Sequence, residues 1–286
     1  MEKKFSSEFA APVGVFDSGV GGLSVLREIR KHLPSEDLIY VADSGYAPYG
    51  NRSAAFIENR ATAITHFLLD SNVKAIVVAC NTVTVVAVNR LRSWCPVPII
   101  AMEPAIKPAA NTTKSGVIGV LATTQTIASP SVSRLCAMYG NNVEVLLQPC
   151  PGLVEQVEQA ELTTLSTRSM ISDYVSPLLS KGADTIVLGC THYPFLGQMI
   201  KEVVGPDVII IDPAAPVARE LSRQLANRQL TSLSDYLGCE NFFTSGSVLH
   251  SKEVTSKLWG KDVEVEELPR KYCKSISCLP KYATCI

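Results

Sequence analysis

The sequence predicts an α/β fold made of two pseudo-symmetric, doubly wound parallel-sheet domains. Three observations lead to this prediction. Short apolar runs rich in β-branched residues alternate with amphipathic stretches along the whole chain. Two of these runs recur about one hundred residues later with similar endings. The chain of 286 residues is also long enough for two cores, since a single α/β domain has roughly 100–200 residues.

The apolar runs are predicted strands, because parallel strands covered on both faces are nearly continuous in Val, Ile and Leu. In chain order they are Val13–Phe16, Leu38–Val41, Ala75–Ala79, Val97–Ala101, Val117–Leu121, Val143–Leu147, Thr185–Leu188 and Val208–Ile211. Between them, helical periodicity predicts connecting helices such as Leu23–Leu33, Ser53–Ser71, Pro130–Tyr139 and Thr167–Lys181.

The repeat concerns the ends of strands. The segment GVFDS at 14–18 is similar to GVLAT at 119–123, and AIVVACNT at 75–82 is similar to TIVLGCTH at 185–192. Ligands of open α/β sheets bind at the carboxyl ends of the strands. Two such halves packed face to face would place both sets of strand ends on one cleft, so we expect the active site between the domains.

Composition limits the partners. The net charge is −1, with 47% hydrophobic and 19% charged residues, which gives no reason to expect a nucleic acid or an acidic membrane surface as partner. The N-terminus has no apolar stretch of a secretory signal, and no segment approaches the ~18 apolar residues of a membrane span. We therefore expect a cytoplasmic protein with a small-molecule partner.

The nine cysteines are expected to be thiols in a reducing compartment. None forms a CxxC pair, and the spacing of Cys273, Cys278 and Cys285 near the end of the chain comes without neighbouring histidines. A metal site is therefore not expected.

Cys80 and Cys190 differ from the other cysteines. Each directly follows an apolar strand and precedes polar residues, in Cys80-Asn81-Thr82 and Cys190-Thr191-His192. The N-terminus of a following helix favours a thiolate. A lone cysteine at a strand end is more often a small buried hydrophobe, but two at equivalent positions of a repeat favour a functional role.

Two opposed thiols suit one kind of chemistry. Acyl transfer by a cysteine has no use for a second, symmetric thiol. Removing a proton from one face of a tetrahedral carbon and returning one to the other face needs two acid/base groups in opposite protonation states. The pair Cys80 and Cys190 therefore predicts racemisation or epimerisation.

Two ionisable residues lie close to these thiols in the sequence. Asp17 ends the first strand, where it could hold a substrate ammonium group, assist Cys80, or serve only as a helix cap or turn residue. His192 could assist Cys190 as an acid/base partner or be a structural hydrogen-bonding residue.

A dinucleotide-binding site is the alternative for FDSGVGG at 16–22, with Asp43 where a ribose-binding acid would lie. Ser24 at the third glycine position and the charge of Asp17 count against it, and the glycines also let backbone approach a carboxylate. The loop with Tyr49 and Gly50 could receive a carboxylate or be a solvated turn.

At these residues the sequence closely resembles the glutamate racemases. The segments that carry the resemblance extend from residue 14 to about 246, and DSGVGG and LGCTHYPFL are the most specific of them. They are GVFDSGVGGLSVL (14–26), PYG (48–50), CNTVT (80–84), PGLVEQVE (151–158), LGCTHYPFL (188–196), IDPA (211–214) and FFTSG (242–246).

The resemblance implies a role for each matching position. It implies that Cys80 and Cys190 exchange the α-proton of glutamate, assisted by Asp17, Glu158 and His192. It implies substrate contacts from Asp17, Ser18, Tyr49, Gly50, Asn81, Thr82, Thr191 and His192. It further implies catalysis without pyridoxal phosphate or metal, and supply of D-glutamate for peptidoglycan in a bacterial cytoplasm.

The resemblance also suggests domain limits. We expect residues 13–104 and 217–262 in the first domain, 105–216 in the second, an N-terminal extension at 1–12 and a C-terminal tail at 263–286. Some family members with such an extension are activated by UDP-N-acetylmuramoyl-L-alanine, which stays open here, as does a homodimer. An aspartate or hydantoin racemase of the same type, or a two-lobed amino-acid-binding protein without catalysis, remain the alternatives.

Overall fold

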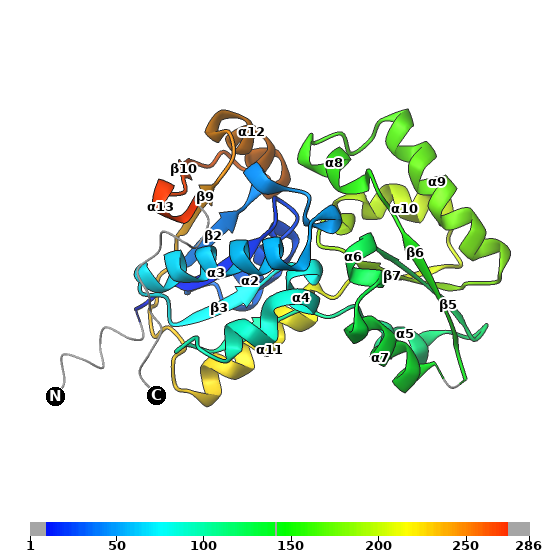
Figure 1. The fold of residues 1–286 in the computed structure, drawn as a ribbon, viewed down its shortest axis with the longest axis horizontal. Coiled ribbons are helices and arrows are strands. Elements are labelled where there is room, and N and C mark those ends of the chain that lie inside the picture. The colour runs from blue at the N-terminus through cyan, green and yellow to red at the C-terminus, as the bar shows by residue number, and fades with distance from the viewer. Residues whose placement is uncertain (1–9, 141, 274–286) are drawn as a thin grey trace.

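The computed structural model describes residues 10–140 and 142–273. Two α/β bodies lie side by side, each built around its own parallel sheet (Figure 1). The larger sheet has six strands in the order β10-β9-β2-β1-β3-β4, and the smaller has four in the order β6-β5-β7-β8. Every pairing between neighbouring strands is parallel.

Eight of the strands correspond to the predicted ones within one or two residues at most ends. The strands are β1 (Val13–Asp17), β2 (Leu38–Ala42), β3 (Ala75–Val78), β4 (Ile99–Ala101), β5 (Val117–Ala122), β6 (Glu144–Pro149), β7 (Thr185–Gly189), β8 (Ile209–Ile211), β9 (Glu240–Thr244) and β10 (Val265–Glu267). The sequence analysis did not predict β9 or β10, which extend the larger sheet beyond β2.

The two sheets share one topology. The order β2-β1-β3-β4 in the first sheet matches β6-β5-β7-β8 in the second. In this correspondence β1 is equivalent to β5 and β3 to β7, which are the strands whose ends repeat in the sequence. The predicted fold class, two pseudo-symmetric doubly wound sheets, is confirmed.

Helices cover both faces of each sheet. They are α2 (Leu23–His32), α3 (Ala54–Asp70), α4 (Asn81–Arg92), α5 (Ile106–Thr112), α6 (Thr124–Ile127), α7 (Pro130–Tyr139), α8 (Leu153–Glu158), α9 (Leu165–Ser180), α10 (Gly197–Val204), α11 (Ala214–Asn227), α12 (Val248–Trp259) and α13 (Arg270–Cys273). Ser53, Ser129 and Thr164 cap α3, α7 and α9, each accepting a bond from a backbone N–H in the first turn.

Side chains that alternate between the two faces of the larger sheet form two buried layers, one on each face. Val13 and Val15 of β1 pack with α2, α11 and α12, whereas Phe16 of the same strand packs with α3, α4 and α13. Successive side chains of a strand point to opposite faces, so a strand covered on both faces must be apolar throughout. This burial fixes where β1 and β3 end, and hence where the polar residues after them lie.

The chain crosses between the bodies twice. It leaves the larger sheet after β4 and returns at the start of α11, which packs against α2. The predicted limit at 216/217 therefore falls inside the first turn of α11, whereas the limit at 104/105 falls between β4 and α5. We keep these two limits as a proposal for the domains.

The tail predicted from residue 263 requires a correction. Val265 begins β10, which pairs with β9, and α13 packs against α3. Leu268 and Tyr272 are buried. These residues belong to the first body because their apolar side chains complete its core. Residues 274–286 of the predicted tail and 1–9 of the predicted extension lie outside the described residues.

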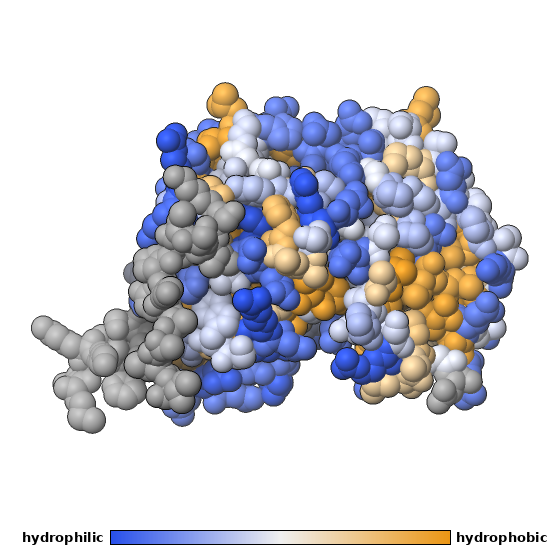
Figure 2. Space-filling model, viewed as in Figure 1, coloured by the Kyte–Doolittle hydropathy of each residue, from blue (hydrophilic) through white to orange (hydrophobic). Residues whose placement is uncertain are grey.

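The surface of the smaller body is notably apolar on one face. Figure 2 shows hydrophobic residues gathered over β5, β6 and β7. The edge strand β6 is only half-buried along most of its length. Among the described residues, no helix combines the length and apolar character needed to cross a bilayer.

Candidate active site

A small cavity between the two bodies contains both cysteines singled out by the sequence. The cavity leaves only about 10 Å³ of free space. Cys80 follows β3 of the first sheet and Cys190 follows β7 of the second, and their side chains are buried. The lining residues are Ser18, Pro48, Tyr49, Gly50, Cys80, Asn81, Thr82, Thr123, Val154, Cys190, Thr191 and His192.

Cys80 lies at the N-terminus of α4, as its N-cap residue. Its thiol donates to Ser18 Oγ over 3.7 Å. Burial raises the pKa of the Cys80 thiol well above its ordinary value, and the neighbouring Asp17 carboxylate raises it further. These surroundings favour the protonated thiol at Cys80.

Asp17 lies behind Cys80 and is not among the residues that line the cavity. Its carboxylate accepts bonds from the backbone N–H groups of Ser18 (2.7 Å) and Gly22 (2.6 Å), and from Thr191 Oγ1 (3.1 Å). Burial raises the pKa of Asp17, although His192, the Cys80 thiol and the Ser18 N–H group oppose the rise. Asp17 thus orders the loop before α2 and places a carboxyl group beside Cys80.

Cys190 has a different neighbour. Its Sγ lies 3.7 Å from His192 Nδ1, and His192 Nε2 lies 2.6 Å from Glu158 Oε1. Burial opposes protonation of His192, but the bonds to Cys190 and Glu158 raise its pKa well above the ordinary value. The two cysteines therefore have different ionisable neighbours: an aspartate at Cys80, and a histidine bound to a glutamate at Cys190.

Glu158 joins the two bodies. From α8 of the second body, Glu158 Oε1 accepts the backbone N–H of Val20 (2.7 Å), and Oε2 accepts Ser44 Oγ (3.1 Å), both in the first body. A Cβ at Gly19 would lie 1.9 Å from Glu158 Oε1. Glycine is therefore required there for the carboxylate to approach the backbone. Like Asp17, Glu158 acts from behind the cavity wall.

The other predicted substrate contacts line the cavity. Tyr49, Gly50 and Thr191 are in its wall, and Thr82 Oγ1 lies 3.0 Å from Thr123 Oγ1 of the second body. The amide N and O atoms of Asn81 are buried and have no hydrogen-bond partner among the described residues. Unpaired buried amide atoms are costly, and a ligand with both donors and acceptors would satisfy those of Asn81.

Sequence reasoning missed three residues of the cavity wall: Pro48, Thr123 and Val154. For Thr123 a signal existed, because GVLAT places it at the position equivalent to Ser18 in GVFDS. Pro48 precedes Tyr49 in the quoted PYG segment, and Val154 lies in PGLVEQVE. Val154 contributes only an apolar surface, which no sequence pattern distinguishes from an ordinary core residue.

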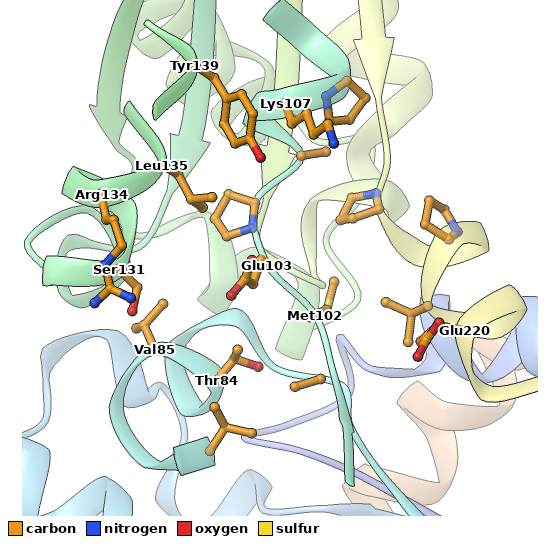
Figure 3. A pocket seen from close by; sticks show the side chains of 18 of the residues that line it. Thr84, Val85, Met102, Glu103, Lys107, Ser131, Arg134, Leu135, Tyr139 and Glu220 are labelled. Carbon is orange, nitrogen blue, oxygen red and sulfur yellow. The ribbon is translucent and has the colours of Figure 1, made fainter. Parts of the chain in front are cut away.

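A larger cavity, of about 480 Å³, lies at the crossings between the bodies. Figure 3 shows Thr84 and Val85 of α4, Met102 and Glu103 of the crossing, Lys107 of α5, residues of α7 including Arg134 and Tyr139, and Glu220 of α11 around it. Neither cysteine of the pair lines this cavity. The chemistry predicted from Cys80 and Cys190 therefore belongs to the smaller cavity. Across 10–140 and 142–273, no three His, Cys, Asp or Glu residues cluster as metal ligands.

Comparison with known proteins identifies the family of the chain. The family model described as Asp/Glu/Hydantoin racemase matches residues 14–221. The chain belongs to this racemase family. A glutamate racemase from Stutzerimonas stutzeri is 48% identical over 264 residues, which cover 92% of this chain and 99% of the relative.

Solved structures of the racemase family have the same fold. A glutamate racemase isoform from Bacillus anthracis superposes with a TM-score of 0.80 at 34% identity, covering 90% of this chain and 97% of that one. Escherichia coli glutamate racemase, in complex with L-glutamate and the activator UDP-MurNAc-ala, gives 0.79 at 31% identity, covering 90% and 98%. The predicted family and enzyme class, an amino-acid racemase, are confirmed.

Proposed function

We propose that the protein interconverts L- and D-glutamate by two-base proton transfer between Cys80 and Cys190, without an added cofactor. The observation that carries this proposal is the placement of one buried thiol from each sheet in a single closed cavity. Asp17, Glu158 and His192 set the protonation of the thiols. Ser18, Tyr49, Gly50, Asn81, Thr82 and Thr191 would contact the substrate.

In one direction, the Cys190 thiolate removes the α-proton, so that an S–H bond forms as the Cα–H bond breaks. The Cys80 thiol then delivers its proton to the opposite face of the same carbon, and the negative charge ends on Cys80. The roles exchange for the reverse direction. His192 lies beside the Cys190 sulfur and Asp17 beside the Cys80 thiol, so each thiol has an ionisable partner of its own.

Glutamate is the proposed substrate for two reasons. Relatives named glutamate racemase are 48% identical over almost their whole length. The unpaired amide of Asn81 and the N-terminus of α4 provide polar partners for an amino acid's ammonium and carboxylate groups. Aspartate, with a side chain shorter by one methylene, is the competing substrate to test in parallel.

The decisive experiment incubates the purified enzyme with L-glutamate in deuterated water, without added cofactor. Circular dichroism should show loss of optical activity, and mass spectrometry should show deuterium at Cα. Replacing either Cys80 or Cys190 by serine should reduce racemisation by at least about 1000-fold, because a hydroxyl is a poor base at neutral pH.

Cys95→Ser is the matched control, since Cys95 is a half-buried thiol away from the cavity. This variant should racemise glutamate like the unmodified enzyme. Full activity in Cys80→Ser or Cys190→Ser would eliminate the two-thiol mechanism. Faster turnover of L-aspartate than of L-glutamate would reassign the substrate.

The proposal includes a cellular role. The D-glutamate would enter peptidoglycan in a bacterial cytoplasm, and the chain should rescue a bacterium that requires D-glutamate, whereas Cys80→Ser should not. Because the Escherichia coli structure contains UDP-MurNAc-ala as activator, the assay should be repeated with that nucleotide. If kcat/KM is unchanged in its presence, UDP-MurNAc-ala does not activate this enzyme.

A homodimer is also part of the proposal. The half-buried apolar side chains of β6 form a surface that a second copy would cover. Light scattering measures the mass of the protein in solution, and a monomer at all concentrations would exclude this part.

A further inference from the structure

The loop between β2 and α3 brings Tyr49 and Gly50 to the cavity, and a buried ion pair holds this loop. The Tyr49 hydroxyl donates to Asp43 Oδ2. Arg60 of α3 donates from Nε to Asp43 Oδ2 (2.9 Å) and from Nη2 to Oδ1 (2.7 Å). Asp43 is fully buried and Arg60 is 5% exposed. The planar guanidinium thus fixes the carboxylate through two parallel bonds.

The same guanidinium reaches the C-terminal segment 265–273. Arg60 Nη1 donates to the backbone carbonyl of Tyr272 over 2.8 Å, and Arg60 Cζ lies over the Tyr46 ring, 4.0 Å from its centroid. The Tyr46 hydroxyl donates to the carbonyl of Cys273. Two carbonyl groups of α13 therefore accept bonds from the loop and from the arginine that orders it.

The C-terminal segment is itself firmly attached to the first body. The backbone N–H of Leu268 donates to Thr244 O over 2.7 Å. The Tyr272 ring packs edge-on against Phe67 of α3, at 5.3 Å between centroids, and its hydroxyl donates to Asp70. Movement of α13 would therefore displace the acceptors of Arg60 and Tyr46 together.

We infer that the C-terminal segment 265–273 is a positioning element for substrate binding, acting through Arg60 and Asp43 on the loop that carries Tyr49 and Gly50. Arg60 is a positioning residue, since Asp43 and Tyr49 lie between it and the cavity. This inference rests on the proposed role of Tyr49 and Gly50 as substrate contacts. The loop would bind glutamate without touching the transferred proton, so its displacement should weaken binding more than it slows chemistry.

Steady-state kinetics of full-length variants test the inference. In Arg60→Lys, the ammonium group retains the charge beside Asp43 but cannot bond both carboxylate oxygens and the Tyr272 carbonyl. In Tyr272→Ala, the ring that holds α13 is lost. Each change should raise KM for glutamate by about tenfold or more and leave kcat within about threefold, since small misplacements of a binding group weaken its contacts.

Two matched variants serve as controls. Arg90→Lys alters an exposed ion pair between α4 and Glu58 of α3, the helix that carries Arg60, and Lys271→Ala alters an exposed pair with Asp70. Both should retain the KM of the unmodified enzyme within about twofold, because exposed pairs contribute little.

The double variant Arg60→Lys/Tyr272→Ala tests whether the two substitutions affect KM through the same contacts or independently. Its effect on KM should be smaller than the product of the single effects, because both changes break the same connection. Unchanged KM in a folded Tyr272→Ala enzyme, or multiplicative effects in the double variant, would overturn the inference. Failure of the two-thiol mechanism would appear separately, as activity surviving in Cys80→Ser.

Discussion

At the scale of single residues, the difference between the two thiols is the most informative feature of the site. The pKa of Cys80 is raised by burial and by Asp17. At Cys190, the partner is instead a histidine whose own pKa is raised through Cys190 and Glu158. The two thiols thus have unequal surroundings, although the strands that carry them are at equivalent positions of the two sheets.

Glu158→Gln tests whether Glu158 raises the pKa of His192. Removing the carboxylate removes one of the interactions that raise the pKa of His192, so the imidazolium is lost at lower pH than in the unmodified enzyme. The alkaline limb of kcat/KM should therefore move to lower pH. A pH profile measures this shift, with Glu155→Gln on the same helix as control. An alkaline limb that does not move would show that Glu158 does not tune His192.

Sequence reasoning reached most of the cavity wall because cysteines and their polar neighbours follow recognisable strand ends. It did not recognise the buried pair of Asp43 and Arg60. Asp43 directly follows β2, at the position of a ribose-binding acid in a dinucleotide fold, but its carboxylate binds Arg60 and Tyr49. An arginine seventeen residues away on an amphipathic helix carries no local sign that its side chain is directed inward.

At the scale of elements, the apolar strands of both sheets were predictable because burial on two faces leaves no room for polar residues. The two missed strands are exceptions to that rule. Glu240 and Asn241 occupy the start of β9, and β10 has only three residues, two of which are exposed glutamates. Strands near a sheet edge keep one side in solvent, so their sequences resemble loops.

Asp184, directly before β7, organises the turn that leads into β5. Its carboxylate accepts bonds from Thr113 Oγ1 (2.6 Å), the N–H groups of Lys114 (2.7 Å) and Ser115 (2.8 Å), and Thr185 Oγ1 (2.9 Å). Burial opposes its ionisation, but these donors lower the pKa of Asp184 well below the usual range. Asp184→Asn should lower the free energy of unfolding by about 1–3 kcal/mol at neutral pH.

The sign of the pH dependence follows from the lowered pKa. The carboxylate of Asp184 stabilises the fold fully above the ordinary aspartate pKa of ~3.9, and this stabilisation is lost as the pH falls through the folded-state value. Urea unfolding between about pH 7 and pH 2 should show the difference between the unmodified protein and Asp184→Asn shrinking on acidification. A difference that grows in acid would contradict the assignment.

At the scale of the whole molecule, the active cavity belongs to neither body alone. The cavity is closed by contacts between the bodies, such as Glu158 with Val20 and Thr82 with Thr123. Within the described part of the chain, two short segments connect the bodies. We therefore expect glutamate to enter and leave through a relative movement of the two bodies about these crossings.

Substrate binding should stabilise both bodies together. For Cys190→Ser, which should bind glutamate without racemising it, glutamate at 100 times Kd should add about 2.7 kcal/mol to the free energy of unfolding. Calorimetry should show one transition that moves to higher temperature. Two transitions, of which glutamate shifts only one, would mean that the ligand contacts one body alone.

The closed cavity has a consequence for the reactivity of the protein toward thiol reagents. Cys80 and Cys190 are 3% and 6% exposed, whereas Cys239 lies open on the surface. Among the cysteines of residues 10–140 and 142–273, a bulky electrophile should therefore alkylate Cys239 first and leave catalysis intact. The rate at which a small electrophile inactivates the enzyme should report how often the two bodies separate. A covalent inhibitor of this racemase should gain selectivity from resembling the substrate closely enough to be enclosed, rather than from a more reactive warhead.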